Sequence, residues 1–105
     1  MTTENAVKMD GTSQFKWNPR VATRTLDDTA FVLLQSRMVS LNEVGTFLWE
    51  HYKDASTLNA AVGAVVETFE TTEHDARPDV VEFTRELLNK ELLVSAETTV
   101  NGGTP

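Results

Sequence analysis

The chain has 105 residues, of which 40% are hydrophobic and 24% are charged, values typical of one small globular domain with a modest core. There are 9 basic and 16 acidic side chains, and the resulting formal net charge of −7 disfavours contact with nucleic acid or an anionic membrane. The absence of cysteine excludes a disulfide framework and a thiolate metal site.

Both ends of the chain are polar and show no periodic pattern. We therefore predict a disordered N-terminal tail at residues 1–14, one domain at residues 15–96 and a disordered C-terminal tail at residues 97–105. The N-terminus lacks the apolar core of a signal peptide, and no apolar run approaches the length of about 20 residues that a membrane span needs. These features favour a cytoplasmic protein.

The first part of the predicted domain is rich in strand signals. Three short segments, residues 21–26, 30–35 and 38–39, are separated by tight turns at Asp27–Asp28 and Ser36–Arg37. Strands this close in sequence favour an antiparallel meander. The middle segment, AFVLLQ, is a continuous apolar run and is typical of a central strand.

Helical periodicity follows. Ser40 and Glu43 have the spacing of a capping box, and apolar residues then recur with helical spacing up to Tyr52. A second helix is predicted from Ser56 or Thr57 to about residue 69. The third is predicted from residue 79 to about residue 91, after a loop at 71–79 and with Pro78 in its first turn. The apolar run at residues 92–95 predicts a closing strand or an extended segment packed on the core.

This order of elements predicts an α+β fold. We expect a winged-helix-like domain in which a three-stranded antiparallel sheet is followed by three helices.

Three blocks of sequence in the predicted helical part carry a recognisable pattern. They are SLNEVGTFLWE at residues 40–50, TLNAAVGAVVETF at 57–69 and DVVEFTRELLNKELL at 79–93, and the strand ending in VLL precedes them. In this order and at this spacing they resemble the PqqD family, the stand-alone form of the recognition element used in ribosomal peptide modification. The chain departs from the family at Asp54–Ala55 and at Glu91, where members usually have glycine.

The resemblance implies a non-enzymatic protein without a cofactor or metal. It implies binding of the leader of a ribosomally made precursor peptide, as an added strand on the edge of the third strand. It also implies presentation of that peptide to a modifying enzyme, commonly a radical-SAM protein. The groove would lie between the third strand and the third helix. The candidate peptide-binding residues are Arg37, Met38, Val39, Val81, Thr84, Arg85 and Leu88, and Arg85 would pair with an acidic leader residue.

Two other functions fit the same fold outline. A winged-helix DNA-binding protein would use the third helix for recognition, but residues 79–91 contain four acidic and two basic side chains, which phosphate repels. An adaptor or stabilising subunit for another protein is not separated from a peptide-binding protein by the sequence. The negative charge has two interpretations: it favours a basic partner, or it serves only to keep the domain soluble. An exposed strand edge also permits a homodimer.

Several individual residues have a structural and a functional interpretation. Trp49 is predicted to be in the core, whereas Trp17 fits either a packed or an exposed position. His51 and His74 have no metal-ligand spacing, and no pairing of a nucleophile with a base is visible. Gly45 and Gly63 fall inside predicted helices, where glycine favours close contact between helices.

Overall fold

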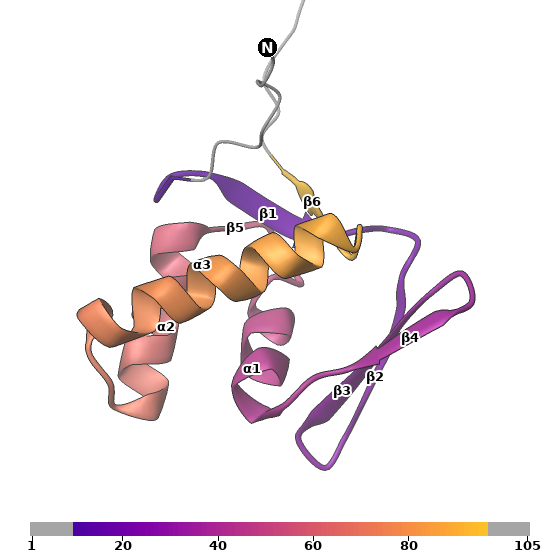
Figure 1. Cartoon of the computed structure of the whole chain (residues 1–105), viewed down its shortest axis with the longest axis horizontal. Coiled ribbons are helices and arrows are strands. Elements are labelled where there is room, and N and C mark those ends of the chain that lie inside the picture. Colours follow the sequence, from indigo (N-terminus) through magenta and orange to yellow (C-terminus); the bar gives the residue numbers. More distant parts are fainter. Residues whose placement is uncertain (1–9, 97–105) are drawn as a thin grey trace, which may run out of the picture.

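The computed structural model describes residues 10–96 (Figure 1). Residues 1–9 of the predicted N-terminal tail lie outside this range, as does the whole predicted C-terminal tail at residues 97–105. The elements in chain order are β1 (Gln14–Trp17), β2 (Ala22–Leu26), β3 (Thr29–Leu34), β4 (Arg37–Ser40), α1 (Glu43–His51), β5 (Ser56–Thr57), α2 (Leu58–Phe69), α3 (Glu73–Asn89) and β6 (Leu93–Ser95).

The N-terminal boundary of the ordered part differs from the prediction. Residues 10–14 were assigned to the tail, but they form a turn and begin β1. Ser13 N–H donates to the Asp10 carbonyl at 3.1 Å, and Thr12 N–H donates to the Asp10 carboxylate at 3.0 Å. A short aspartate side chain that accepts a hydrogen bond from two residues onward stabilises such a turn without any apolar pattern.

The predicted meander is confirmed as the antiparallel sheet β2–β3–β4, and the fold is α+β with three helices. A second antiparallel sheet, with strand order β5–β1–β6, was not predicted except for its last strand. It joins the beginning, middle and end of the described chain, and Figure 1 shows it above the helices, with the meander at the lower right. None of the described helices is long and apolar enough to cross a membrane.

The start of α1 corrects the predicted capping box. Ser40 belongs to β4, and the extended chain continues to Leu41, whose N–H still donates to the Ala30 carbonyl at 2.9 Å, so the helix begins later. Asn42 is the cap instead, and its side-chain oxygen accepts a hydrogen bond from Gly45 N–H at 2.7 Å. Asparagine and serine are comparable as caps, so the sheet pairing decides between them.

The other two helices begin at threonine caps. Thr57 precedes α2 as predicted, and its hydroxyl accepts from Ala60 N–H at 3.1 Å. Thr72 caps α3 by accepting from Asp75 N–H at 3.2 Å, so α3 starts more than one turn earlier than predicted and takes in most of the expected loop. Pro78 therefore lies inside the helix, which continues across it without the hydrogen bond that a proline nitrogen cannot donate.

Two tryptophans join the two sheets through α1. Trp49 is fully buried, as predicted, and its indole N–H donates to the Thr23 hydroxyl in β2 at 2.9 Å. Trp17 of β1 stacks on Trp49 with ring centroids 4.7 Å apart, and its N–H donates to the Trp49 carbonyl at 2.6 Å. The ambiguous Trp17 is thus a packed residue, and both indole donors are satisfied, as buried indoles require.

A buried hydroxyl pair connects α3 to α1. The Tyr52 hydroxyl lies 3.0 Å from the Thr84 hydroxyl, and both side chains are fully buried. Burial raises the pKa of Tyr52, and the hydrogen bond to Thr84 opposes part of that rise. The contact lies in the buried stripe of α3 with Val80 and Leu87, and this stripe determines which side chains face the meander.

Candidate functional site

The strand β4 forms one edge of the meander. It pairs with β3 on one side, and within residues 10–96 no strand pairs with it on the other. Three of its four residues are exposed. An unpaired edge offers backbone donors and acceptors to an incoming strand.

The phase of the β3–β4 hydrogen bonds determines which backbone groups face the free edge. Leu41 N–H donates to the Ala30 carbonyl at 2.9 Å, in register with the strand pairs that precede it. Opposed residues in an antiparallel ladder alternate between hydrogen-bonded and non-hydrogen-bonded pairs. Counting back from Leu41, Val39 and Arg37 direct their backbone groups toward β3.

Met38 and Ser40 are therefore the two β4 residues whose backbone N–H and C=O groups point away from β3. Among the described residues, no backbone or side-chain group bonds to them from that side. The predicted strand residues Arg37, Met38 and Val39 thus divide into two kinds: Met38 offers backbone groups, and its neighbours do not. Ser40 offers the same groups and was missed.

The side chains of β4 alternate between the two faces of the sheet. Arg37 and Val39 stand opposite buried residues of β3 and so point to the inner face, toward the helices. Met38 stands opposite Leu33 on the outer face, where the two side chains are 63% and 42% exposed. A ligand beside the inner face of β4 would meet Arg37 and Val39.

A hollow of about 380 Å³ lies between β4 and the C-terminal end of α3; we call it the β4 hollow. Figure 1 shows α3 running toward the side of the molecule that carries the meander. Arg37 and Lys90 bring two cationic side chains to this hollow in an otherwise acidic protein, and Lys90 also pairs with Glu86 at 3.1 Å. Its lining residues are Leu34, Arg37, Met38, Val39, Lys90 and Leu92.

The four residues predicted on α3 do not line the β4 hollow. Thr84 is fully buried and bonded to Tyr52, so its side chain belongs to the core. Val81 is half-buried and lines a different shallow depression near the start of α3. Arg85 is exposed, and Leu88 is half-buried against the core.

The helical period explains this difference. Lys90 shares a face of α3 with Phe83 and Asp79, which lie seven and eleven residues earlier, about two and three turns at 3.6 residues per turn. Residues 81, 85 and 88 fall on the opposite flank of the buried stripe that contains Val80, Thr84 and Leu87. Both flanks adjoin the core, so periodicity alone did not identify the one that faces β4.

The described residues show little that suggests catalysis. No group of three or more metal-ligating side chains occurs within residues 10–96. His51 Nε2 lies 2.7 Å from the Ser56 hydroxyl, a contact that the sequence did not reveal. The same hydroxyl lies 3.3 Å from the Thr57 carbonyl, to which it can donate. Burial lowers the pKa of His51. We interpret the pair as a structural link between α1 and β5.

Comparison with known proteins gives one family and two similar structures. Residues 2–93 match the sequence model of the family described as coenzyme PQQ synthesis protein D (PqqD). One similar structure is TbiB1 in complex with the TbiA(beta) leader peptide, with 26% identity, a TM-score of 0.71 and coverage of 80% of this chain and 99% of that one. Another is a lasso peptide synthetase B1 complexed with the leader peptide, with 15% identity, a TM-score of 0.67 and coverage of 76% and 96%. A search of curated protein sequences finds no match.

Proposed function

The chain belongs to the PqqD family, and on this premise we propose that it is a non-catalytic protein that binds the leader of a ribosomally made precursor peptide. The leader adds as a fourth strand along β4, and the protein presents it to a modifying enzyme of the radical-SAM class. The observation that carries this proposal is the free edge at Met38 and Ser40 beside the β4 hollow. The two similar structures each hold a leader peptide, which supports the same class of ligand here.

Strand addition suits this edge because affinity and selectivity come from different groups. The backbone of Met38 and Ser40 supplies hydrogen bonds that any peptide sequence satisfies. Alternate side chains of the added strand point to the inner face, where the β4 hollow accepts them. Apolar Leu34, Val39 and Leu92 favour an apolar leader residue, and the cations Arg37 and Lys90 favour an acidic residue next to it.

The proposal assigns the helical wall of the groove to the face of α3 that carries Lys90. The sequence-based candidates Val81, Arg85 and Leu88 become a competing set on the other flank of the same helix. The contribution of Thr84 in either case is to hold α3 in place through Tyr52.

Removal of one backbone N–H at the edge tests strand addition. Met38→Pro removes the N–H that faces the free edge and leaves the bonds to β3 intact, since proline is tolerated where a strand N–H faces solvent. We expect Met38→Pro to weaken binding of a labelled leader peptide at least tenfold, about 1.4 kcal/mol. The leader is taken from a precursor encoded beside this chain, and binding is measured by fluorescence anisotropy.

The matched control is Met38→Val, which keeps the N–H and changes only the exposed side chain. It should bind within about twofold of the parent protein. Equal affinities for the proline and valine variants, with both folded by circular dichroism, would show that the leader does not bond to this edge.

A further inference from the structure

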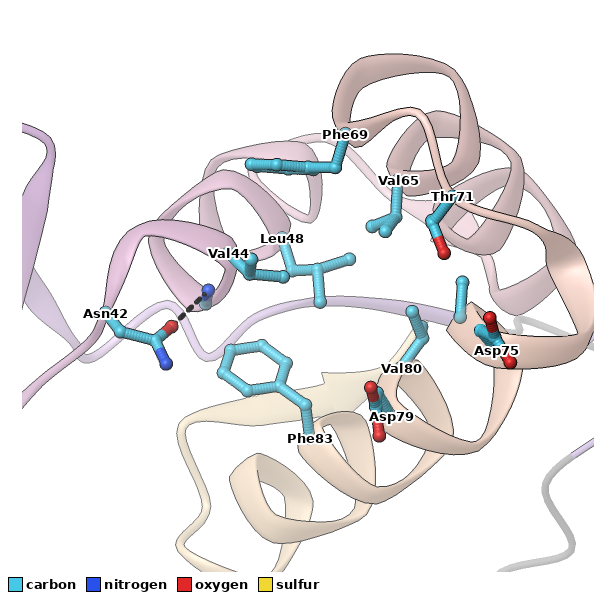
Figure 2. A pocket seen from close by; sticks show the side chains of 12 residues that line it. Asn42, Val44, Leu48, Val65, Phe69, Thr71, Asp75, Asp79, Val80 and Phe83 are labelled. Atoms are coloured by element: carbon cyan, nitrogen blue, oxygen red, sulfur yellow. Dashed lines mark hydrogen bonds between the residues drawn. The ribbon is translucent and has the colours of Figure 1, made fainter.

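A second hollow, of about 430 Å³, lies between α1, α2 and the N-terminal half of α3 (Figure 2). We call it the helical hollow. It shares no lining residue with the β4 hollow. On α3, Phe83 is the lining residue nearest to Lys90 and precedes it by seven residues, about 10 Å along the axis. The two hollows are therefore neighbouring but separate recesses.

The interior of the helical hollow is apolar. Figure 2 shows Phe69 and Phe83 on opposite sides, with Val44 and Leu48 between them. Val44 is 38% exposed and is one of few large hydrophobic side chains on the described surface. An apolar recess of this kind favours an inserted apolar side chain.

Specific contacts hold the two aromatic walls in place. Gly45 lets Phe83 approach α1, because a Cβ at residue 45 would lie 3.0 Å from Cε1 of Phe83. Phe69 packs edge-to-face on Phe47, with ring centroids 5.4 Å apart and an interplanar angle of 88°. The hollow is thus a preformed feature of helix packing, and a ligand would meet walls that are already positioned.

The rim on the α3 side is acidic. Asp75 and Asp79 are exposed, lie one helical turn apart, and both border the hollow in Figure 2. Neither carboxylate forms an ion pair within residues 10–96, where the ion pairs found are Arg77–Glu73 and Lys90–Glu86. Like charges one turn apart disfavour each other by a few tenths of a kcal/mol, and a cation from a partner would relieve this repulsion.

We infer that the helical hollow is the docking site for the modifying enzyme, which inserts an apolar side chain flanked by lysine or arginine. The inference rests on the proposed function. The apolar interior takes the inserted side chain, the two carboxylates pair with the flanking cations, and the net charge of −7 attracts a basic surface. Because the β4 hollow is a separate recess, one molecule binds the leader and the enzyme at the same time.

The test compares enzyme binding and leader binding in the same variants. The probes are the purified modifying enzyme encoded beside this chain and the leader peptide of its precursor. Asp75→Lys with Asp79→Lys reverses the rim, and we expect at least tenfold weaker binding of the enzyme, measured by biolayer interferometry. Binding of the leader should stay within twofold, because the β4 hollow is unchanged.

The matched control is Glu67→Lys with Glu82→Lys. Both residues are exposed, and neither borders the helical hollow. The two double variants change the net charge by the same four units, so a difference between them reports position and not total charge. Val44→Lys changes α1 instead of α3 and blocks the apolar interior, and it should weaken enzyme binding as the rim variant does, even if reversal at Asp75 impairs folding.

Equal enzyme affinity in the rim variant and its control, with Val44→Lys also unchanged, overturns the inference. The inference is also overturned if the parent protein does not bind the enzyme. It is overturned as well if residues 1–9 or 97–105 occupy the hollow and exclude the enzyme. Failure of the proposed function looks different, because the parent protein then does not bind the leader whatever the enzyme does. The inference is supported when the rim variant and Val44→Lys lose only the enzyme.

Discussion

Two cations define the ligand preference of the β4 hollow. Arg37 points to the inner face of β4 because it stands opposite a buried residue of β3, and Lys90 reaches the same hollow from the end of α3. Lys90 is held near Glu86, but this ion pair is exposed and contributes at most about 1 kcal/mol. Its ammonium group can therefore turn to an acidic residue of a bound leader at little cost.

A pair of substitutions on α3 separates the two possible groove walls. Lys90→Glu should weaken binding of an acidic leader about tenfold, or ~1.4 kcal/mol, because it places a carboxylate in the β4 hollow. Arg85→Glu changes the net charge equally on the opposite flank and should alter affinity less than twofold. Titrations of both variants with the leader by isothermal calorimetry, at one salt concentration, show which flank of α3 forms the wall of the groove. The reverse ranking would restore the sequence-based wall of Val81, Arg85 and Leu88.

At the scale of elements, local pattern predicted the meander well. The Asp27–Asp28 turn was predicted correctly, whereas the second turn lies at Gln35–Ser36, one residue before the predicted Ser36–Arg37, so β4 begins at Arg37. Neither turn contains the glycine that usually marks a hairpin. Asp27, Asp28 and Gln35 instead adopt positive φ of 50°, 64° and 58°. Glu91, where the family usually has glycine, does the same with φ of 65°, so the backbone turn persists without that residue.

The position of the turn between β3 and β4 determines which β4 residues face the free edge. Residues that flank a two-residue hairpin turn form a hydrogen-bonded pair, so Arg37 must bond to β3 and Met38 must face outward, with Ser40 following in phase. The observed turn is Gln35–Ser36, whereas the sequence predicted Ser36–Arg37, and a shift of one residue reverses this phase, so the sequence did not identify Ser40 as an edge residue. The helical wall was not accessible either, because the flank of α3 that faces β4 depends on tertiary packing.

The two helix-interior glycines should respond oppositely to alanine. An added Cβ at Gly63 would meet nothing within 4 Å, so Gly63→Ala should raise the free energy of unfolding by about 0.5–1 kcal/mol through helix propensity. At Gly45 the Cβ would lie 3.0 Å from Phe83 and 3.1 Å from the capping oxygen of Asn42, so Gly45→Ala should lower it by about 1 kcal/mol. Urea denaturation measures both, and an equal gain at both sites would refute close packing at Gly45.

At the scale of the whole molecule, long-range pairing limited the prediction. The β5–β1–β6 sheet joins residues near 15, 56 and 94, and no local pattern relates segments so distant. Trp17 and Trp49 were recognisable as large apolar residues, but their stacking depends on that sheet. The sequence therefore predicted which residues are buried more reliably than which elements they join.

The stability of the whole molecule should be greatest between two pH limits set by neighbouring residues. Burial lowers the pKa of His51 from 6.5 in the folded state, so the unfolded chain takes up a proton more readily as the pH falls below that value. Burial raises the pKa of Tyr52 above 10.0, so the unfolded chain loses its proton first as the pH rises past that value. The free energy of unfolding should therefore decline below about pH 6.5 and above about pH 10.

Two substitutions assign these slopes. His51→Gln keeps a hydrogen-bonding side chain near Ser56 but does not titrate, so it should flatten the decline between pH 7.5 and 5.5. Tyr52→Phe lowers stability at every pH, because it leaves the Thr84 hydroxyl without its partner, but it should remove the alkaline decline. Urea denaturation measures the acid slope between pH 7.5 and 5.5 and the alkaline slope above about pH 10. If His51→Gln kept the full acid slope, other groups would control it, and burial of His51 would not link protonation to folding.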